Sequence, residues 1–234
     1  MLERVLVTTI EVLGRDVALP VEVRTARSAA ATFLVRHDAV SRLMDGTGLT
    51  PARLPGGRAL CILAVVDYLD NDLGAYHEVG VCFGVGKDGD APPGAYIHQL
   101  PVDGEFTCAA GRGIWGFPKW IARIDLDWSG GGVHARLAEG DDLVLDVTVK
   151  RRRIPFPGKG GEMSAYASLD GTTRRTPFGM EPSGVKGGPF GGRLLLGETH
   201  PMARDLRSLG LPKRPIATSV IGNLAATFGE ASAI

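Results

Sequence analysis

The sequence lacks an excess of charge of either sign, because 26 Lys and Arg residues balance 26 Asp and Glu residues along its 234 positions. A nucleic-acid-binding protein needs a basic excess to neutralise phosphates, so we expect no nucleic acid as a partner. Long apolar runs are missing too: no stretch reaches the roughly 18 uncharged apolar residues of a membrane span, and charged residues interrupt the N-terminal stretch. We therefore expect a cytoplasmic protein with neither a signal peptide nor a membrane partner.

Cysteine is scarce as well. Cys61, Cys82 and Cys108 are odd in number, far apart and without paired spacing, which argues against a disulfide framework and against a zinc site. The five histidines are dispersed along the chain, so they offer no better set of metal ligands. The sequence therefore predicts no metal site.

Glycine and proline, in contrast, are abundant, with 33 and 15 residues. They bound short apolar or alternating runs that are typical of strands, so we expect a mainly β (α+β) protein, an antiparallel sheet large enough to curl, and one domain over residues 1–234. The predicted strands are Val5–Val12, Val17–Val23, Ala30–Arg36, Ala59–Tyr68, Tyr76–Val85, Ala95–Leu100, Lys119–Trp128, Val133–Leu137, Leu143–Arg151 and Arg193–Leu196. The predicted helices are Ala39–Met44, Glu105–Arg112 and Met202–Leu209.

The segment Pro155–Gly192 does not follow these patterns. It mixes Gly and Pro with polar pairs such as Thr172-Thr173 and shows no sustained periodicity. We interpret it as a long irregular excursion, either mobile or in contact with another subunit.

The most informative block of the sequence surrounds one lysine. The chain has six lysines against 20 arginines, and Lys119 follows directly on Phe117-Pro118, between Trp115 and Trp120. An ammonium group in a dry aromatic pocket is costly, so the pKa of this lysine should fall and its neutral amine should become a nucleophile toward a carbonyl carbon. Such an amine forms a Schiff base.

Strand parity supports this hypothesis and also supplies its alternative. In the predicted strand Tyr76–Val85, Glu78 shares its face with small residues such as Gly80 and Cys82, which leaves room for a ligand. After Pro118, Lys119 and Trp120 should point to opposite faces, so Trp120 should pack in the core without contacting the amine. The alternative is that Lys119 simply begins a polar outer face.

In these and other segments the chain resembles the acetoacetate decarboxylase family. The matching pieces, spread over Arg24 to Phe228, are Gly111-Arg112, Gly116–Lys119, Gly74–Glu78, Tyr96–His98 leading to Asp103, and a weaker C-terminal match at Gly192–Pro201. The resemblance implies a closed antiparallel β-barrel or cone with a few short helices. It also implies that Lys119 is the Schiff-base nucleophile, activated as the lysine of acetoacetate decarboxylase is known to be, and that Glu78 helps to handle the substrate.

The chain departs from the family pattern at two charged positions. Family decarboxylases have a second lysine after the nucleophile, where this chain has Trp120, and a carboxylate 15 positions before the glutamate, where it has Leu63. A substrate-facing arginine has two candidates, Arg24 and Arg27, of which Arg27 fits the spacing better. We expect the substrate pocket to be lined by Arg27, Leu63, Trp115 and Phe117.

Three functions remain open at this point. The first is a Schiff-base-forming, decarboxylase-like lyase for a small keto acid, which needs no metal or organic cofactor. The second is a family member with altered enamine chemistry, such as an aldolase, dehydratase or hydratase. The third is a barrel that binds a small molecule without turnover. Because family members assemble, we also expect a homo-oligomer.

Overall fold

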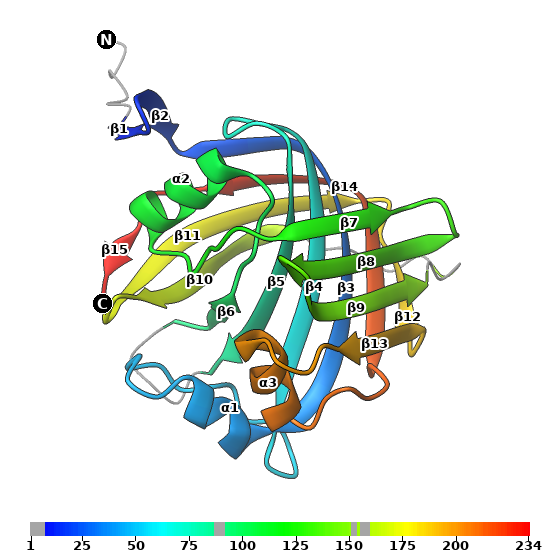
Figure 1. The fold of residues 1–234 in the computed structure, drawn as a ribbon. Helices are drawn as coiled ribbons and strands as arrows, with labels where there is room; N and C mark the ends of the chain where they lie inside the picture. Colours follow the sequence, from blue (N-terminus) through cyan, green and yellow to red (C-terminus); the bar gives the residue numbers. More distant parts are fainter. Residues whose placement is uncertain (1–7, 87–91, 151–153, 155–159) are drawn as a thin grey trace.

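The computed structural model describes residues 8–86, 92–150, 154 and 160–234, and this part of the chain forms 15 strands and three short helices (Figure 1). The strands are β1 (Thr8–Val12), β2 (Arg15–Leu19), β3 (Val21–Arg36), β4 (Arg58–Asn71), β5 (Tyr76–Val85), β6 (Gly94–Gln99), β7 (Arg123–Asp127), β8 (Gly132–Glu139), β9 (Asp142–Lys150), β10 (Gly161–Leu169), β11 (Thr172–Ser183), β12 (Lys186–Pro189), β13 (Gly192–Leu196), β14 (Ala217–Phe228) and β15 (Ser232–Ala233). The helices are α1 (His37–Leu43), α2 (Glu105–Trp115) and α3 (Pro201–Ser208).

Seven strands close into a barrel. Their order around the wall is β14, β3, β4, β5, β6, β10 and β11, and β11 pairs again with β14. All neighbours are antiparallel except β6 and β10, which run parallel. Strand directions cannot alternate all the way around a ring with an odd number of strands, so one parallel pair is unavoidable. The prediction of a closed β-barrel with few helices is confirmed, and the barrel is mixed rather than purely antiparallel.

The barrel strands build two apolar cores. The outer core lies between the barrel wall and a four-stranded sheet of β13, β9, β8 and β7, and it includes Phe33, Leu63 and Phe83. The inner core lies inside the barrel and under α2, and it includes Val21 and Val66. Successive residues of a strand point to opposite faces, so one strand supplies both cores in turn. Each large apolar side chain that is fully buried contributes about 1.5–3 kcal/mol to stability.

β-Bulges interrupt the pairing of several barrel strands, among them β3 and β14. The pairing register shifts between Val23 and Ala26 in β3, and β14 shifts in the same way beyond Ile221. A bulge inserts a residue without a direct partner and changes which residues point inward. Beyond the bulge of β3, Ser28 faces the barrel interior and Arg27 the outside.

The prediction of an irregular excursion at Pro155–Gly192 is wrong for most of that segment. Residues 155–159 lie outside the described chain, but β10, β11 and β12 follow, and two of them complete the barrel. The residues from Ser164 to Ala167 are buried without a break, so no alternation of apolar and polar residues marks the strand. Strand β14 was not predicted either, since most of its residues are small or polar and Gly222-Asn223 lie at its bulge. Both β10 and β14 are formed by pairing with neighbouring strands, and the local sequence pattern does not indicate them.

The three predicted helices are present, and their bounds differ slightly. Helix α3 begins at Pro201, one residue before the predicted start, and the ring of His200 accepts a hydrogen bond from the backbone N–H of Met202. Figure 1 shows α2 across one end of the barrel, with α1 and α3 near the other end. Within the described residues, no helix is long and apolar enough to cross a membrane. The predicted strand Lys119–Trp128 is regular only over β7.

Candidate active site

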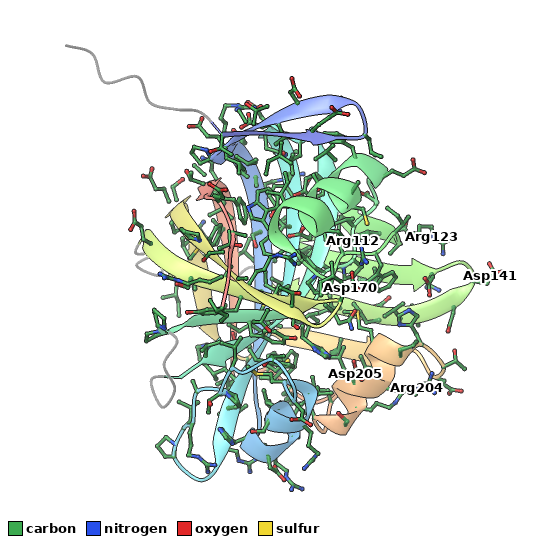
Figure 2. All side chains as sticks on the ribbon, turned by 90° about the vertical axis from the view of Figure 1, so that its left-hand side faces the viewer. Arg112, Arg123, Asp141, Asp170, Arg204 and Asp205 are labelled. Carbon is green, nitrogen blue, oxygen red and sulfur yellow. The ribbon has the colours of Figure 1, made fainter. Side chains whose placement is uncertain are left out.

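The end of helix α2 sets the path of the chain toward Lys119. Gly116 has a φ of 67°, a left-handed conformation that glycine adopts without strain. The backbone N–H of Phe117 then donates to the carbonyl oxygen of Gly111 at 3.0 Å. The guanidinium of Arg112, at the end of the same helix (Figure 2), donates to the carbonyl oxygen of Lys119 at 3.0 Å. These contacts fold the Gly-Phe-Pro-Lys segment back against α2.

The side chain of Lys119 runs along α2 because residue 111 is a glycine. A Cβ atom at Gly111 would lie 2.5 Å from Cδ and 2.6 Å from Cε of Lys119, closer than carbon atoms can approach. The glycine of the Gly111-Arg112 pair therefore has a steric role: it lets the lysine stem pass into the barrel.

The amine of Lys119 ends in a polar cluster that is almost completely buried. Nζ lies 3.0 Å from Oε2 of Glu78, donates to Oγ1 of Thr107 at 3.0 Å, and sits 4.9 Å above the centre of the Tyr76 ring. The hydroxyl of Tyr68 donates to the other carboxylate oxygen of Glu78 at 3.1 Å. Lys119 is only 3% exposed, so it does not begin a polar outer face.

The pair with Glu78 changes the expected titration of the lysine. Burial lowers the pKa of Lys119, but the nearby Glu78 carboxylate and Tyr76 raise it by more, so the pKa lies above its ordinary value. The prediction of a lowered pKa is wrong for the unliganded site, because the sequence did not show that a carboxylate lies 3.0 Å from the amine. Burial, and then the charge of Glu78, also raise the pKa of Tyr68 well above its ordinary range.

A cavity of about 230 Å³ inside the barrel contains this cluster. Trp115 and Phe117 line it as predicted, and so do Gly80 and Cys82, which share the face of Glu78. Its remaining walls are mostly apolar and come from all seven barrel strands, with Val21, Val23, Ser28, Ala64, Val66, Tyr68, Tyr76, Ala95, Ile97, Leu100, Met163, Ala165, Phe178, Met180, Ile221, Leu224 and Phe228 among them.

Two of the predicted pocket residues lie elsewhere. Arg27 points outward, where it donates to Asp67 at 3.1 Å and lies 4.8 Å above the ring of Trp128. Leu63 is 1% exposed and packs in the outer core. The bulge in β3 and the alternation of β4 are the physical reason, because they turn these side chains away from the cavity.

Residues next to Arg27 and Leu63 in the same two strands line the cavity instead. They are Ser28 in β3 and Ala64 and Val66 in β4. The other arginine candidate, Arg24, forms ion pairs with Asp70 and Asp72 at the surface and does not line the cavity with Lys119.

The expected separation of Lys119 and Trp120 is confirmed. Trp120 packs against the outer core, stacks on His200 at 5.0 Å, and donates from Nε1 to Gln99 at 3.0 Å. It has no contact with the amine, so the tryptophan that replaces the family's second lysine belongs to another part of the molecule.

Sequence reasoning missed three residues that contact the Lys119–Glu78 pair. Thr107 lies four positions before Gly111 on α2, so helix periodicity alone places both on one face. Tyr76 belongs to the segment that carries the family resemblance, and Tyr68 pairs with it across β4 and β5. The position of Tyr68 depends on the pairing register of β4 and β5, which no feature of the sequence indicates.

A closed barrel of mainly antiparallel strands with a buried lysine–glutamate pair defines the class of this protein. The sequence model of the acetoacetate decarboxylase family matches residues 15–164, more than half of the chain. The chain therefore belongs to the acetoacetate decarboxylase family. At the level of that family it is an enzyme of the decarboxylase-like lyase class. A search among curated proteins finds no match.

Solved structures share the fold. An acetoacetate decarboxylase is 20% identical with a TM-score of 0.69, covering 92% of this chain and 89% of its own. The acetoacetate decarboxylase of Legionella pneumophila is 18% identical with a TM-score of 0.69, covering 92% and 87%. The enduracididine biosynthesis enzyme MppR, in a complex with pyruvate, is 17% identical with a TM-score of 0.63, covering 92% and 90%. At these identities, the similarity supports the fold alone.

Proposed function

We propose that the protein is a Schiff-base-forming lyase in which the amine of Lys119 condenses with the carbonyl group of a small substrate. The observation that carries the proposal is the Lys119–Glu78 pair, buried in a cavity that has room for a small molecule. A lysine this deeply buried is expensive to maintain, and a passive apolar pocket has no need for it.

The pair supplies the proton transfers that the reaction needs. In the resting site the amine of Lys119 forms an ion pair with the Glu78 carboxylate, at a distance of 3.0 Å. Transfer of one proton to Glu78 frees the amine, whose nitrogen then attacks the carbonyl carbon. Loss of water, with the proton returned from Glu78, leaves an iminium ion beside the Glu78 carboxylate. The hydroxyl groups of Thr107 and Tyr68 hold the two partners in place.

The iminium ion accepts electrons from the substrate. In a 3-keto acid, the bond to the carboxyl group breaks, carbon dioxide leaves, and the electron pair forms an enamine that is then protonated. Because MppR has been solved with pyruvate, keto acids are one substrate class to test, beside neutral ketones. Enamine addition or dehydration uses the same intermediate, so the trapping experiment comes before any assay of one reaction.

Reduction with borohydride tests the proposal. The protein is incubated with acetoacetate, pyruvate or a neutral ketone, reduced, digested and analysed by mass spectrometry. We expect a substrate-derived adduct on Lys119. Absence of an adduct on Lys119 with every carbonyl compound would overturn the proposal and favour a binding barrel without turnover. The cytoplasmic location and the homo-oligomer remain predictions from the sequence.

A further inference from the structure

The walls of the cavity indicate which carbonyl compounds fit. We infer that the preferred substrate is a neutral ketone or aldehyde with an apolar body, and that Glu78 removes a proton from the carbon next to its carbonyl group. This inference rests on the proposed Schiff base at Lys119. It goes further, because it excludes a carboxylate from the substrate and assigns the base.

Charge is the first argument. Among the residues that the structure describes, Lys119 and Glu78 are the only charged side chains lining the cavity, and they pair with each other at 3.0 Å. The inward positions of β3 and β4 hold Ser28, Ala64 and Val66. A substrate carboxylate would therefore face apolar walls and the negative charge of Glu78. Burying a charge without a partner is strongly unfavourable.

The balance of charge during the reaction leads to the same conclusion. Protonated Lys119 and a ketone give an iminium ion and water, so one positive charge stays beside the one negative charge of Glu78. When Glu78 takes a proton from the α-carbon, the C–H electron pair becomes the enamine double bond. The iminium nitrogen and Glu78 then both become neutral. Charged groups are poorly solvated in an apolar cavity, so neutralising the iminium ion and the Glu78 carboxylate costs less there than it does in water. A keto acid would add an uncompensated negative charge at every stage.

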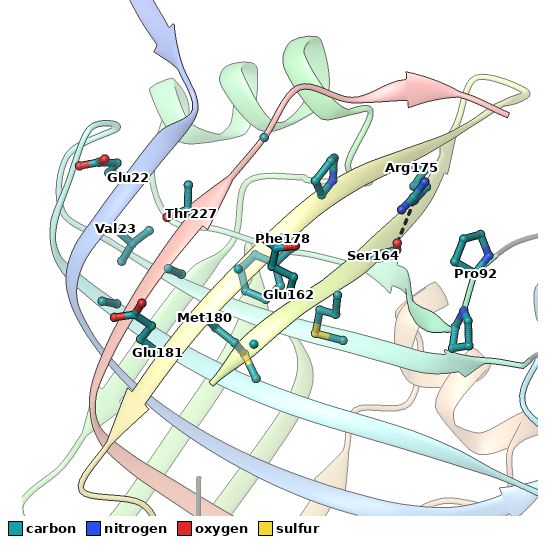
Figure 3. A pocket seen from close by; sticks show the side chains of 18 of the residues that line it. Glu22, Val23, Pro92, Glu162, Ser164, Arg175, Phe178, Met180, Glu181 and Thr227 are labelled. Carbon is teal, nitrogen blue, oxygen red and sulfur yellow. Dashed lines mark hydrogen bonds between the residues drawn. The ribbon is translucent and has the colours of Figure 1, made fainter. Parts of the chain in front are cut away.

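The groove next to the cavity is the third argument. A groove of about 1020 Å³ on the outside of the barrel shares Met163, Phe178 and Met180 with the cavity, so the two adjoin at β10 and β11. Figure 3 shows this groove, with Glu162 and Glu181 among its lining residues.

Of the two arginines among the described residues of the groove, only Arg24 is neutralised by carboxylates, and Arg175 is held by a neutral hydroxyl. Arg24 is bound to two aspartates, and Arg175 donates to Ser164 at 2.8 Å. An apolar floor with carboxylates around it favours a neutral molecule over an anion.

A pair of isosteric ketones tests the inference. Acetoacetate and 4-methyl-2-pentanone have the same arrangement of heavy atoms and a similar size, but only the first carries a carboxylate. After borohydride reduction at equal concentrations, we expect at least about tenfold more Lys119 adduct from 4-methyl-2-pentanone, because only acetoacetate brings an unpaired charge into the cavity. Adducts with and without loss of carbon dioxide are both counted for acetoacetate.

Proton removal has its own measurement. In D₂O, we expect the protein to exchange the α-protons of 4-methyl-2-pentanone, as followed by ¹H NMR. In the Glu78→Gln variant the Lys119 adduct should form more slowly, because Glu78 also assists iminium formation. Relative to the amount of adduct, the exchange should fall by about a further 100-fold, since general-base catalysis contributes at least that much. Exchange by Glu78→Gln at the wild-type rate would remove Glu78 as the base.

Substitution of the cavity wall gives the matched control. Ser28→Arg adds a cation at an inward position, so it should shift the adduct ratio toward acetoacetate, whereas Ser28→Leu should not. An adduct from acetoacetate but none from 4-methyl-2-pentanone in the wild-type protein would overturn the inference and leave the Schiff-base proposal standing. No Lys119 adduct from either compound would overturn both.

Discussion

The inner and outer cores are built by the same strands, yet they differ in what they contain. The outer core is a closely packed set of apolar side chains such as Leu63 and Val65. The inner core leaves a cavity of about 230 Å³ and surrounds a charged pair, Lys119 and Glu78. Strand alternation therefore gives the two faces of the barrel wall different roles. The outer face stabilises the fold, and the inner face keeps space and polar groups for chemistry.

The largest effect that separates the two regions should come from the lysine itself. Lys119→Gln removes the nucleophile, so we expect complete loss of the borohydride-trapped adduct and of any turnover. The control is Lys150→Gln, at an exposed strand end, which should keep both. A trapped adduct of wild-type yield in Lys119→Gln, located on another lysine, would move the chemistry out of the inner core.

Helix α2 offers the next test, through two glycines. Gly111→Ala places a methyl group 2.5 Å from the Lys119 stem, so the amine must move away from Glu78. We expect the rate of adduct formation to fall by about tenfold or more, since small displacements in an active site are costly. Gly113→Ala has no atom within 4 Å of the new methyl group and should keep the rate, with a stability gain of about 0.5–1 kcal/mol. Equal rates in both variants would contradict the steric role of Gly111.

Two adjacent valines of β4 test the difference between the outer and the inner core directly. Val65 is 1% exposed in the outer core, and Val66 is 9% exposed and lines the cavity. Val65→Ala should lower the free energy of unfolding by about 2 kcal/mol and leave adduct formation unchanged. Val66→Ala should cost less than about 1 kcal/mol, because Val66 faces the open space of the cavity and loses fewer packing contacts, but it should change which ketones are trapped. Urea unfolding and the trapping assay measure the two effects. A larger loss of stability in Val66→Ala than in Val65→Ala would refute the different roles of the two cores.

The smallest effect should be the pH dependence of the buried pair. The pKa of Lys119 is raised in the folded protein, so the stabilisation by the pair is fully present below about 10.5, its ordinary value, and is lost as the pH rises through the higher, folded value. We expect the free energy of unfolding of the wild-type protein to fall with rising pH in that alkaline window. Lys119→Met should show a shallower fall, measured by urea unfolding at a series of pH values. Identical slopes would mean that the pair does not titrate as the structure indicates.

The sequence indicated much of the site but little of its electrostatics. Lys119, Glu78, Trp115 and Phe117 were all predicted and all lie at the cavity, because an aromatic-Pro-Lys motif and strand parity are local features. The direction of the Lys119 pKa was predicted wrongly. Its sign depends on the 3.0 Å distance to Glu78, and these two residues lie 41 positions apart in the sequence.

The sequence by itself determined the class of fold and the two residues of the buried pair, since period-2 patterns, turn residues and a family motif can be read within short windows. Only the tertiary structure decided that β10, β11 and β14 complete the barrel, that Arg27 and Leu63 point away from the cavity, and that Tyr68 and Thr107 contact the pair. The physical reason is the same each time. Strand register, bulges and ring closure are set by pairing between distant segments, and a shift of one residue moves a side chain to the other face of the wall.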